Sequence, residues 1–141
     1  MLLMSERNYT YFHKQLLSWY KDVGRTLPWR ETNDPYKILV SEIMLQQTQV
    51  SRVIDKYDSF IRKFPDVYSL AKASTSTVIR EWSGMGYNKR AVNLHRTAQI
   101  IVQHHDGQVP KSLESLVSLP GIGRYTASAI ANFAFKLRVP V

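Results

Sequence analysis

The stretch L-P-G-I-G-R-Y-T-A, residues 119–127, constrains the fold more than any other part of this chain of 141 residues. Pro120 ends whatever precedes it, while Gly121 and Gly123 can adopt positive φ and leave the backbone bare. An apolar stripe at helical spacing follows at Thr126, Ala127, Ile130 and Ala131. A glycine turn that leads into a helix presents free N–H groups to an anion such as phosphate. Taken alone, a G-x-G pattern favours an ordinary turn between two helices.

The surroundings of this turn favour the anion site. Leu116 and Leu119 precede the turn at helical spacing, and the chain carries 19 basic against 11 acidic residues, a net charge of +8. Such a charge suits a polyanionic partner, most commonly nucleic acid, although charge alone does not exclude a basic protein without one. The string L-x-x-L-P-G-I-G-x-x-T-A resembles the helix-hairpin-helix motif of DNA-binding and DNA-repair proteins. That motif grips a phosphate backbone without reading sequence.

Helical periodicity continues along nearly the whole chain, and no stretch has a convincing strand pattern. Asp34 followed by Pro35 is a helix start signal, an N-cap with proline at the first helical position. The pattern predicts an all-α fold, a compact helical array. The predicted helices cover residues 9–23, 35–47, 50–64, 65–70, 74–82, 91–104, 113–117 and 124–135.

Composition excludes several classes of protein. The chain has no cysteine, which excludes disulfides, cysteine-ligated zinc and an iron–sulfur cluster held by this chain alone. Its histidines lack partners at ligand spacing, so we expect no metal site from side chains. No apolar run is long enough to span a membrane. We therefore expect an intracellular protein without a membrane partner, in the cytoplasm or nucleoid, or in the nucleus or mitochondrion of a eukaryote.

Glu42 is a carboxyl in the middle of an apolar helical run, with Ile38 and Leu45 on its own face. A buried carboxyl resists ionisation, so its pKa rises. A carboxyl that stays protonated near neutral pH can act as a general acid. The alternative is a glutamate at a helix edge that pairs with Lys37 or Arg52. Periodicity leaves both interpretations open.

The block L-P-W-R-x-x-x-D-P-Y-K-I-L-V-S-E-I-M-L-Q-Q-T-Q-V closely resembles the adenine DNA glycosylases of the helix-hairpin-helix superfamily. G-M-G-Y-x-x-R-A-x-N-L and L-P-G-I-G-R-Y-T-A follow in the same order and at compatible spacing, so the resemblance runs from about Leu16 to the last residue. It implies an N-terminal helix and L-P-W-R connector at 1–34, then a six-helix barrel domain at 35–141 with the hairpin at about 113–135. It also implies hydrolysis of the N-glycosidic bond of adenine mispaired with 8-oxoguanine or guanine in double-stranded DNA.

The resemblance assigns roles to residues of the first block. Glu42 matches the catalytic glutamate that protonates adenine. Base chemistry requires the nucleotide outside the stack, and Trp29, Arg30 and Leu45 match the pocket that receives it. Gln47 and Tyr87 match residues that push into the gap that the base leaves, and their alternatives are a polar helix end and a loop aromatic. Thr48 is expected to contact the DNA. Arg90 follows the G-M-G-Y turn and is expected near DNA phosphates, with a solvated basic face as the alternative.

The hairpin carries two further expectations. Leu119, Gly121, Ile122, Gly123 and Arg124 match the phosphate-binding loop, where a monovalent cation on backbone carbonyls often assists. Tyr125 occupies the position at which lyase-type relatives hold a lysine that attacks the sugar. A phenol cannot form a Schiff base, so Tyr125 predicts a monofunctional enzyme that uses water and leaves the strand uncut.

The last residues of the sequence limit the expected activity. In the family a catalytic aspartate follows within a few residues of the position of Val141, and this sequence does not contain it. Loss of such a charge can slow a reaction about a hundredfold or more, so we expect a truncated chain with little adenine release. A non-catalytic DNA-binding module is an alternative, as is a glycosylase for another mismatched base such as thymine. Glu42 and Q-Q-T-Q-V favour adenine.

The predicted N-terminal helix has an apolar side formed by Phe12, Leu16, Trp19 and Tyr20. In the family this helix packs against C-terminal segments that the sequence does not contain. We therefore expect Phe12, Leu16 and Trp19 to be partly exposed and to promote self-association.

Overall fold

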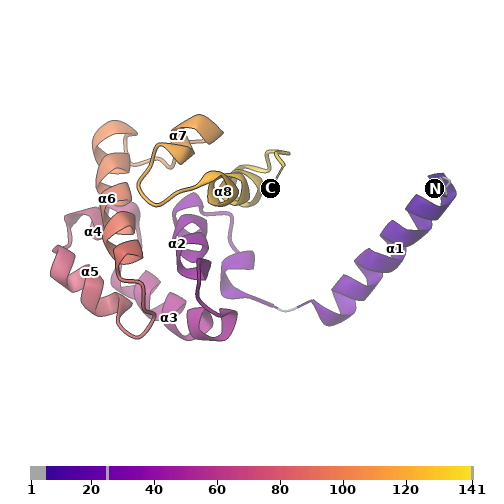
Figure 1. Ribbon diagram of the computed structural model, residues 1–141, viewed down its shortest axis with the longest axis horizontal. Coiled ribbons are helices and arrows are strands. Elements are labelled where there is room, and N and C mark those ends of the chain that lie inside the picture. Colours follow the sequence, from indigo (N-terminus) through magenta and orange to yellow (C-terminus); the bar gives the residue numbers. More distant parts are fainter. Residues whose placement is uncertain (1–5, 25, 141) are drawn as a thin grey trace.

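The computed structural model describes residues 6–24 and 26–140, and these ranges contain helices and turns but no strand (Figure 1). The all-α prediction is confirmed. The elements are α1 (Glu6–Val23), a 3-10 turn η1 (Pro28–Arg30), α2 (Pro35–Leu45), α3 (Val50–Lys63), α4 (Val67–Lys72), α5 (Thr75–Trp82), α6 (Lys89–His104), α7 (Leu113–Val117) and α8 (Arg124–Phe135).

Helix α2 is the central element of the helical body. Asp34 caps it by accepting a hydrogen bond from the Tyr36 N–H at 2.9 Å, and Pro35 occupies the first turn. The helix packs against α3, α6 and α8. Its buried side chains are Tyr36, Ile38, Leu39, Val40, Ser41, Ile43 and Met44. The helix is therefore buried on nearly all sides.

Several helix limits differ from the sequence prediction by one to three residues, and two of these differences have a clear local cause. Helix α2 ends at Leu45 instead of Gln47, because Gln47 takes a left-handed conformation with φ of 57° that a helix cannot include. Helix α4 begins after Asp66 instead of at Pro65. Asp66 and Ser69 form a reciprocal capping box, which satisfies the free N–H groups of the first turn. By contrast, α8 has the predicted limits.

Helix α3 turns one apolar face toward the core. Val53, Tyr57 and Phe60 are buried, whereas Ile54 is 36% exposed. Phe60 packs edge-on against Trp82 of α5, with ring centroids 6.0 Å apart. This large aromatic pair turns α3 so that Ile54 lies at the rim.

Helix α1 stands apart from the other helices (Figure 1). Phe12, Leu16 and Trp19 are 53%, 47% and 60% exposed, as expected from the sequence. Leu27 and Trp29 of the connector, in contrast, are buried in the core of the helical body. None of the described helices has the length and apolar character needed to cross a membrane. Self-association through α1 stays a prediction.

Candidate active site

A cavity of about 430 Å³ lies between the C-terminal half of α2 and one face of α8. It combines segments that are far apart in the sequence: η1, the end of α2, and the helix that follows the glycine turn. Its lining residues are Arg30, Glu42, Leu45, Gln46, Tyr125, Thr126, Ala129, Asn132 and Phe133. Four residues singled out from the sequence, Arg30, Glu42, Leu45 and Tyr125, therefore share one cavity.

Glu42 is partly buried in this cavity. Burial raises the pKa of its carboxyl above the ordinary value of 4.5, while the positive charge of Arg30 acts in the opposite direction. Among the described residues, none makes a hydrogen bond with this carboxyl. The charge that acts on Glu42 is thus that of Arg30, not of Lys37 or Arg52. Such a group can hold a proton and present it to a base nitrogen.

Adjacent residues of η1 point to different places. The guanidinium of Arg30 lies over the Phe133 ring, 4.8 Å from its centroid, which holds the arginine at the cavity wall. Trp29 is only 4% exposed and packs edge-on against Tyr57, with centroids 5.5 Å apart. Trp29 therefore supports the site from the core and does not line the cavity, unlike the base-pocket role expected from the sequence.

Gln47 and Tyr87 meet at a second cavity of about 300 Å³. Both are non-glycine residues in the left-handed region, with φ of 57° and 48°, and Tyr87 is 65% exposed. Thr48 and Gly86 also line this cavity. The structure thus brings together the two side chains that the sequence assigned to insertion into the duplex.

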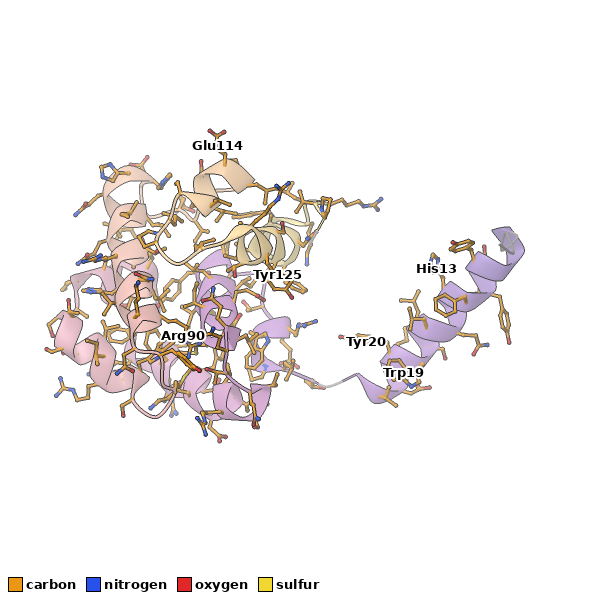
Figure 2. All side chains as sticks on the ribbon, viewed as in Figure 1. His13, Trp19, Tyr20, Arg90, Glu114 and Tyr125 are labelled. Atoms are coloured by element: carbon orange, nitrogen blue, oxygen red, sulfur yellow. The ribbon has the colours of Figure 1, made fainter. Side chains whose placement is uncertain are left out.

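Arg90 lies inside the helical body, only 8% exposed (Figure 2). Its guanidinium donates to the carbonyls of Ile43 at 3.1 Å, Met44 at 2.9 Å, Gly86 at 3.3 Å and Gln46, and to the Thr48 hydroxyl at 2.7 Å. The last carbonyls of a helix have no partner within it and attract a cation. The structure therefore corrects the expectation that Arg90 is free to contact DNA phosphates. The Thr48 hydroxyl is likewise engaged by Arg90.

The two glycines of the hairpin differ in their conformations. Gly121 has a φ of 76°, and a Cβ there would lie 3.0 Å from the Asn93 side chain. Gly123 is extended, with φ −83° and ψ 177°, so only Gly121 confirms the expected positive φ. Leu119 and Ile122 are buried and anchor the turn, so their role is to hold the backbone in place. The space beside Gly123 is open within 4 Å, which leaves its backbone bare.

Two residues that the sequence did not single out hold the hairpin. Thr97 on α6 donates to the Pro120 carbonyl at 3.0 Å. Gln46 donates to the Gly121 carbonyl at 3.2 Å and to the Thr126 hydroxyl at 3.1 Å. Gln46 thereby ties the end of α2 to both the turn and α8. Its position beside Gln47 in Q-Q-T-Q-V was the only signal that the sequence offered.

The first turn of α8 presents polar groups to solvent. Gly123 provides no side-chain cap, so the first N–H groups of α8 are available to an anion. Arg124 and Tyr125 are exposed there, and Tyr125 also reaches the wall of the larger cavity. The described lining of that cavity contains no lysine. No thiolate is available for an iron–sulfur cluster, because the sequence contains no cysteine.

Comparisons with known proteins give this geometry a family context. Residues 40–137 match the HhH-GPD superfamily of base excision DNA repair proteins. An adenine DNA glycosylase of Mycobacterium tuberculosis is 48% identical over 127 residues, which cover 89% of this chain and 42% of the relative. An adenine DNA glycosylase of Rattus norvegicus is 47% identical over 135 residues, 89% of this chain and 26% of the relative. The chain thus spans less than half the length of these relatives.

Solved structures show the same fold. A thermostable thymine-DNA glycosylase has a TM-score of 0.82 and 32% identity, over 90% of this chain and 59% of that one. A non-covalent complex of Endonuclease III with DNA has a TM-score of 0.77 at 18% identity, over 95% and 62% of the two chains, a likeness of fold alone. Because the family match covers most of the chain and includes both the C-terminal half of α2 and the hairpin, the chain belongs to the HhH-GPD superfamily of base excision DNA repair proteins.

Proposed function

We propose that this chain forms the base-binding part of an adenine DNA glycosylase, which hydrolyses the N-glycosidic bond of adenine opposite 8-oxoguanine or guanine. The observation that carries the proposal is Glu42, a carboxyl with a raised pKa in a cavity between α2 and the hairpin helix α8. The names of the relatives at 47–48% identity support adenine as the base.

In this proposal the protonated Glu42 donates its proton to the flipped adenine, which makes the base a better leaving group. The carboxylate left behind is stabilised by the Arg30 guanidinium. The same charge limits the rise of the Glu42 pKa that burial causes, so that Glu42 can still give up its proton. Water then attacks the sugar. Tyr125 cannot form a Schiff base, so the strand stays intact.

The proposed partner is double-stranded DNA. The first turn of α8 would hold a phosphate through its N–H groups, with Arg124 beside it. Gln47 and Tyr87 would fill the gap left by the base. A monovalent cation at the hairpin would rely on the Ile122 carbonyl, the one among the described carbonyls of residues 119–122 that accepts no hydrogen bond. Such a protein would work wherever the cell keeps its DNA.

The test is base release from a duplex with adenine opposite 8-oxoguanine, with protein in excess. We expect strand breaks only after alkali, because the base leaves without strand cutting. Glu42→Gln should lower the rate about a hundredfold or more. Glu114→Gln is the matched control, since Glu114 is exposed on α7, far from the cavity (Figure 2). Equal release by the unaltered chain and Glu42→Gln would refute the role of Glu42.

Two alternatives are outcomes of the same experiment. The thymine-DNA glycosylase structure at 32% identity favours testing thymine opposite guanine. Faster release of thymine than of adenine would change the assigned base. Salt-sensitive duplex binding without release of either base would identify a non-catalytic DNA-binding module.

We also propose that the chain self-associates through α1, which exposes Tyr9, Tyr11, Phe12, Leu16, Leu17, Trp19, Tyr20 and Val23. Pairing of two such helices would remove apolar surface from water. Sedimentation over a range of concentrations should show a dimer that Leu16→Glu and Trp19→Glu together abolish. A monomer at all concentrations would refute this proposal.

A further inference from the structure

Gln47 and Tyr87 share an uncommon backbone conformation. Each lies in the left-handed region, with φ of 57° and 48°, although neither is glycine. Residues held in this region persist only where the surrounding structure fixes them, and they concentrate at functional sites. The two residues belong to different turns, one after α2 and one before α6, so a connection between the turns is needed to keep them together.

Arg90 supplies that connection. On one side its guanidinium binds the residues that flank Gln47, namely the Gln46 carbonyl and the Thr48 hydroxyl, the latter at 2.7 Å. On the other side it donates to the Gly86 carbonyl at 3.3 Å and lies 5.8 Å from the Tyr87 ring centroid. The Arg90 side chain therefore contacts the turns that contain both residues with positive φ, Gln47 and Tyr87.

The chemistry of the acceptors requires an arginine. Arg90 also donates to the Ile43 and Met44 carbonyls at the end of α2, so its partners are neutral oxygens spread over two turns. The rigid, planar fork of a guanidinium reaches several such acceptors at once, whereas a lysine ammonium is a point charge on a flexible stem. Trp82 packs against the guanidinium, 5.1 Å from the ring centroid, and holds it in place.

The same helix also holds the hairpin. Arg90 and Thr97 lie seven residues apart on α6, which is about two helical turns and places them on one face. Thr97 donates to the Pro120 carbonyl of the glycine turn. Helix α6 thus fixes the turns of Gln47 and Tyr87 relative to the proposed phosphate-binding loop.

We propose that Arg90 is the positioning residue that locks Gln47 and Tyr87 into one preformed unit for insertion into the duplex. This inference rests on the proposed function, because it concerns how that same site opens the base stack. Arg90 touches neither DNA nor the reacting base. Its effect is transmitted through the two turns that it joins.

The first experiment uses the free protein. Arg90→Lys keeps the positive charge but loses the planar set of donors of the guanidinium. Because fewer hydrogen bonds then join the two turns, we expect amide hydrogen exchange to accelerate about tenfold or more in residues 45–48 and 85–88 together. Exchange in α8 should not change. Arg80→Lys is the matched control, since Arg80 is exposed on α5 and its side chain hydrogen-bonds only the Thr77 hydroxyl among the described residues. Acceleration in only one segment, or in neither, would overturn the proposal.

The second experiment uses a duplex with 2-aminopurine opposite 8-oxoguanine, whose fluorescence rises when the base leaves the stack. At saturating protein, Arg90→Lys should lose most of that rise while its duplex affinity stays within about threefold, because no phosphate contact is removed. A full rise despite faster exchange would overturn the positioning role. In Arg90→Met, which removes the charge, a lower affinity with a salt slope reduced by about one would make Arg90 a phosphate contact instead.

The two experiments separate this inference from the proposed function. If the unaltered chain gives no fluorescence rise, base extrusion is refuted while hydrogen exchange still decides whether Arg90 joins the turns. If Arg90→Lys does not fold, Thr48→Val removes the acceptor at 2.7 Å and should accelerate exchange in both segments to a smaller extent. Thr48→Ser keeps the hydroxyl and should restore the exchange rates.

Discussion

Arg30 and Arg90 lie on either side of the C-terminal half of α2 but act on it in different ways. Arg30 is exposed at the cavity, over the Phe133 ring, and its charge acts on the Glu42 carboxyl. Arg90 is buried, and its donors bind carbonyls and a hydroxyl. One arginine therefore adjusts the chemistry of the candidate site, while the other sets its geometry. The difference comes from what each guanidinium faces, since the side chains are identical.

The largest expected effect comes from removal of the buried arginine. Arg90→Met should lower the free energy of unfolding by about 3 kcal/mol or more, because several buried carbonyls lose their donor. Arg30→Met should cost less than about 1 kcal/mol, since Arg30 is exposed. Urea denaturation of both variants measures the difference. If both variants lost the same free energy of unfolding, Arg90 would have no greater structural role than Arg30.

Glu42 provides the next test, through the pH dependence of stability. Its carboxyl has a higher pKa in the folded than in the unfolded chain, so the folded state binds the proton more tightly. Stability is therefore lost as pH rises from the unfolded pKa through the folded one. Glu42→Gln should stabilise the protein at pH 7, by roughly 1.4 kcal/mol for each unit of the pKa difference, and have no effect well below pH 4. Thermal unfolding of both proteins across pH checks the sign, and destabilisation at pH 7 would contradict it.

Several features of the site follow directly from the sequence. The glycine turn and apolar stripe predicted α8 with its observed limits, and the apolar run around Glu42 gave a raised pKa as one of two interpretations, the one that the structure favours. These succeeded because capping, helical periodicity and burial are local properties. Arg90 was expected at the surface, near DNA phosphates, but is buried. The sequence suggested the surface because Lys89 and Arg90 follow a glycine turn, a pattern typical of a solvated basic face. Only the tertiary structure brings the end of α2 against it.

Trp29 and Gly123 are two further residues whose roles depend on tertiary structure and do not follow from the sequence. Trp29 shares η1 with Arg30, and the sequence does not tell which of the two faces the cavity. The sequence allowed positive φ at Gly123, but its observed backbone is extended and would accept other residues. Its glycine instead leaves space beside the backbone, a requirement that depends on what approaches from outside.

A smaller effect would sharpen the role of Arg30. Its positive charge lowers the pKa of Glu42 against the effect of burial. Among the described residues, Arg30 is the one whose charge opposes burial, so Arg30→Met should raise the Glu42 pKa further. The stability profile described for Glu42 would then shift to higher pH. Arg90→Met also removes a charge but should leave the pH range of the profile unchanged, and a shift in that variant would place both arginines in the same electrostatic role.

The smallest effect concerns salt. Each phosphate contact contributes about 0.9 to the slope of log affinity against log salt concentration. Arg124 is exposed at the first turn of α8, so Arg124→Gln should reduce the slope by about one contact and change affinity only a few-fold near physiological salt. Arg90→Met also removes a charge but should not change the slope, because a guanidinium that binds α2 carbonyls releases no counterions from DNA. Fluorescence anisotropy with a labelled duplex at several salt concentrations measures both slopes. Equal slopes in Arg124→Gln and the unaltered chain would place the phosphate contact elsewhere, and a reduced slope in Arg90→Met would mean that DNA draws the buried arginine out of the helical body.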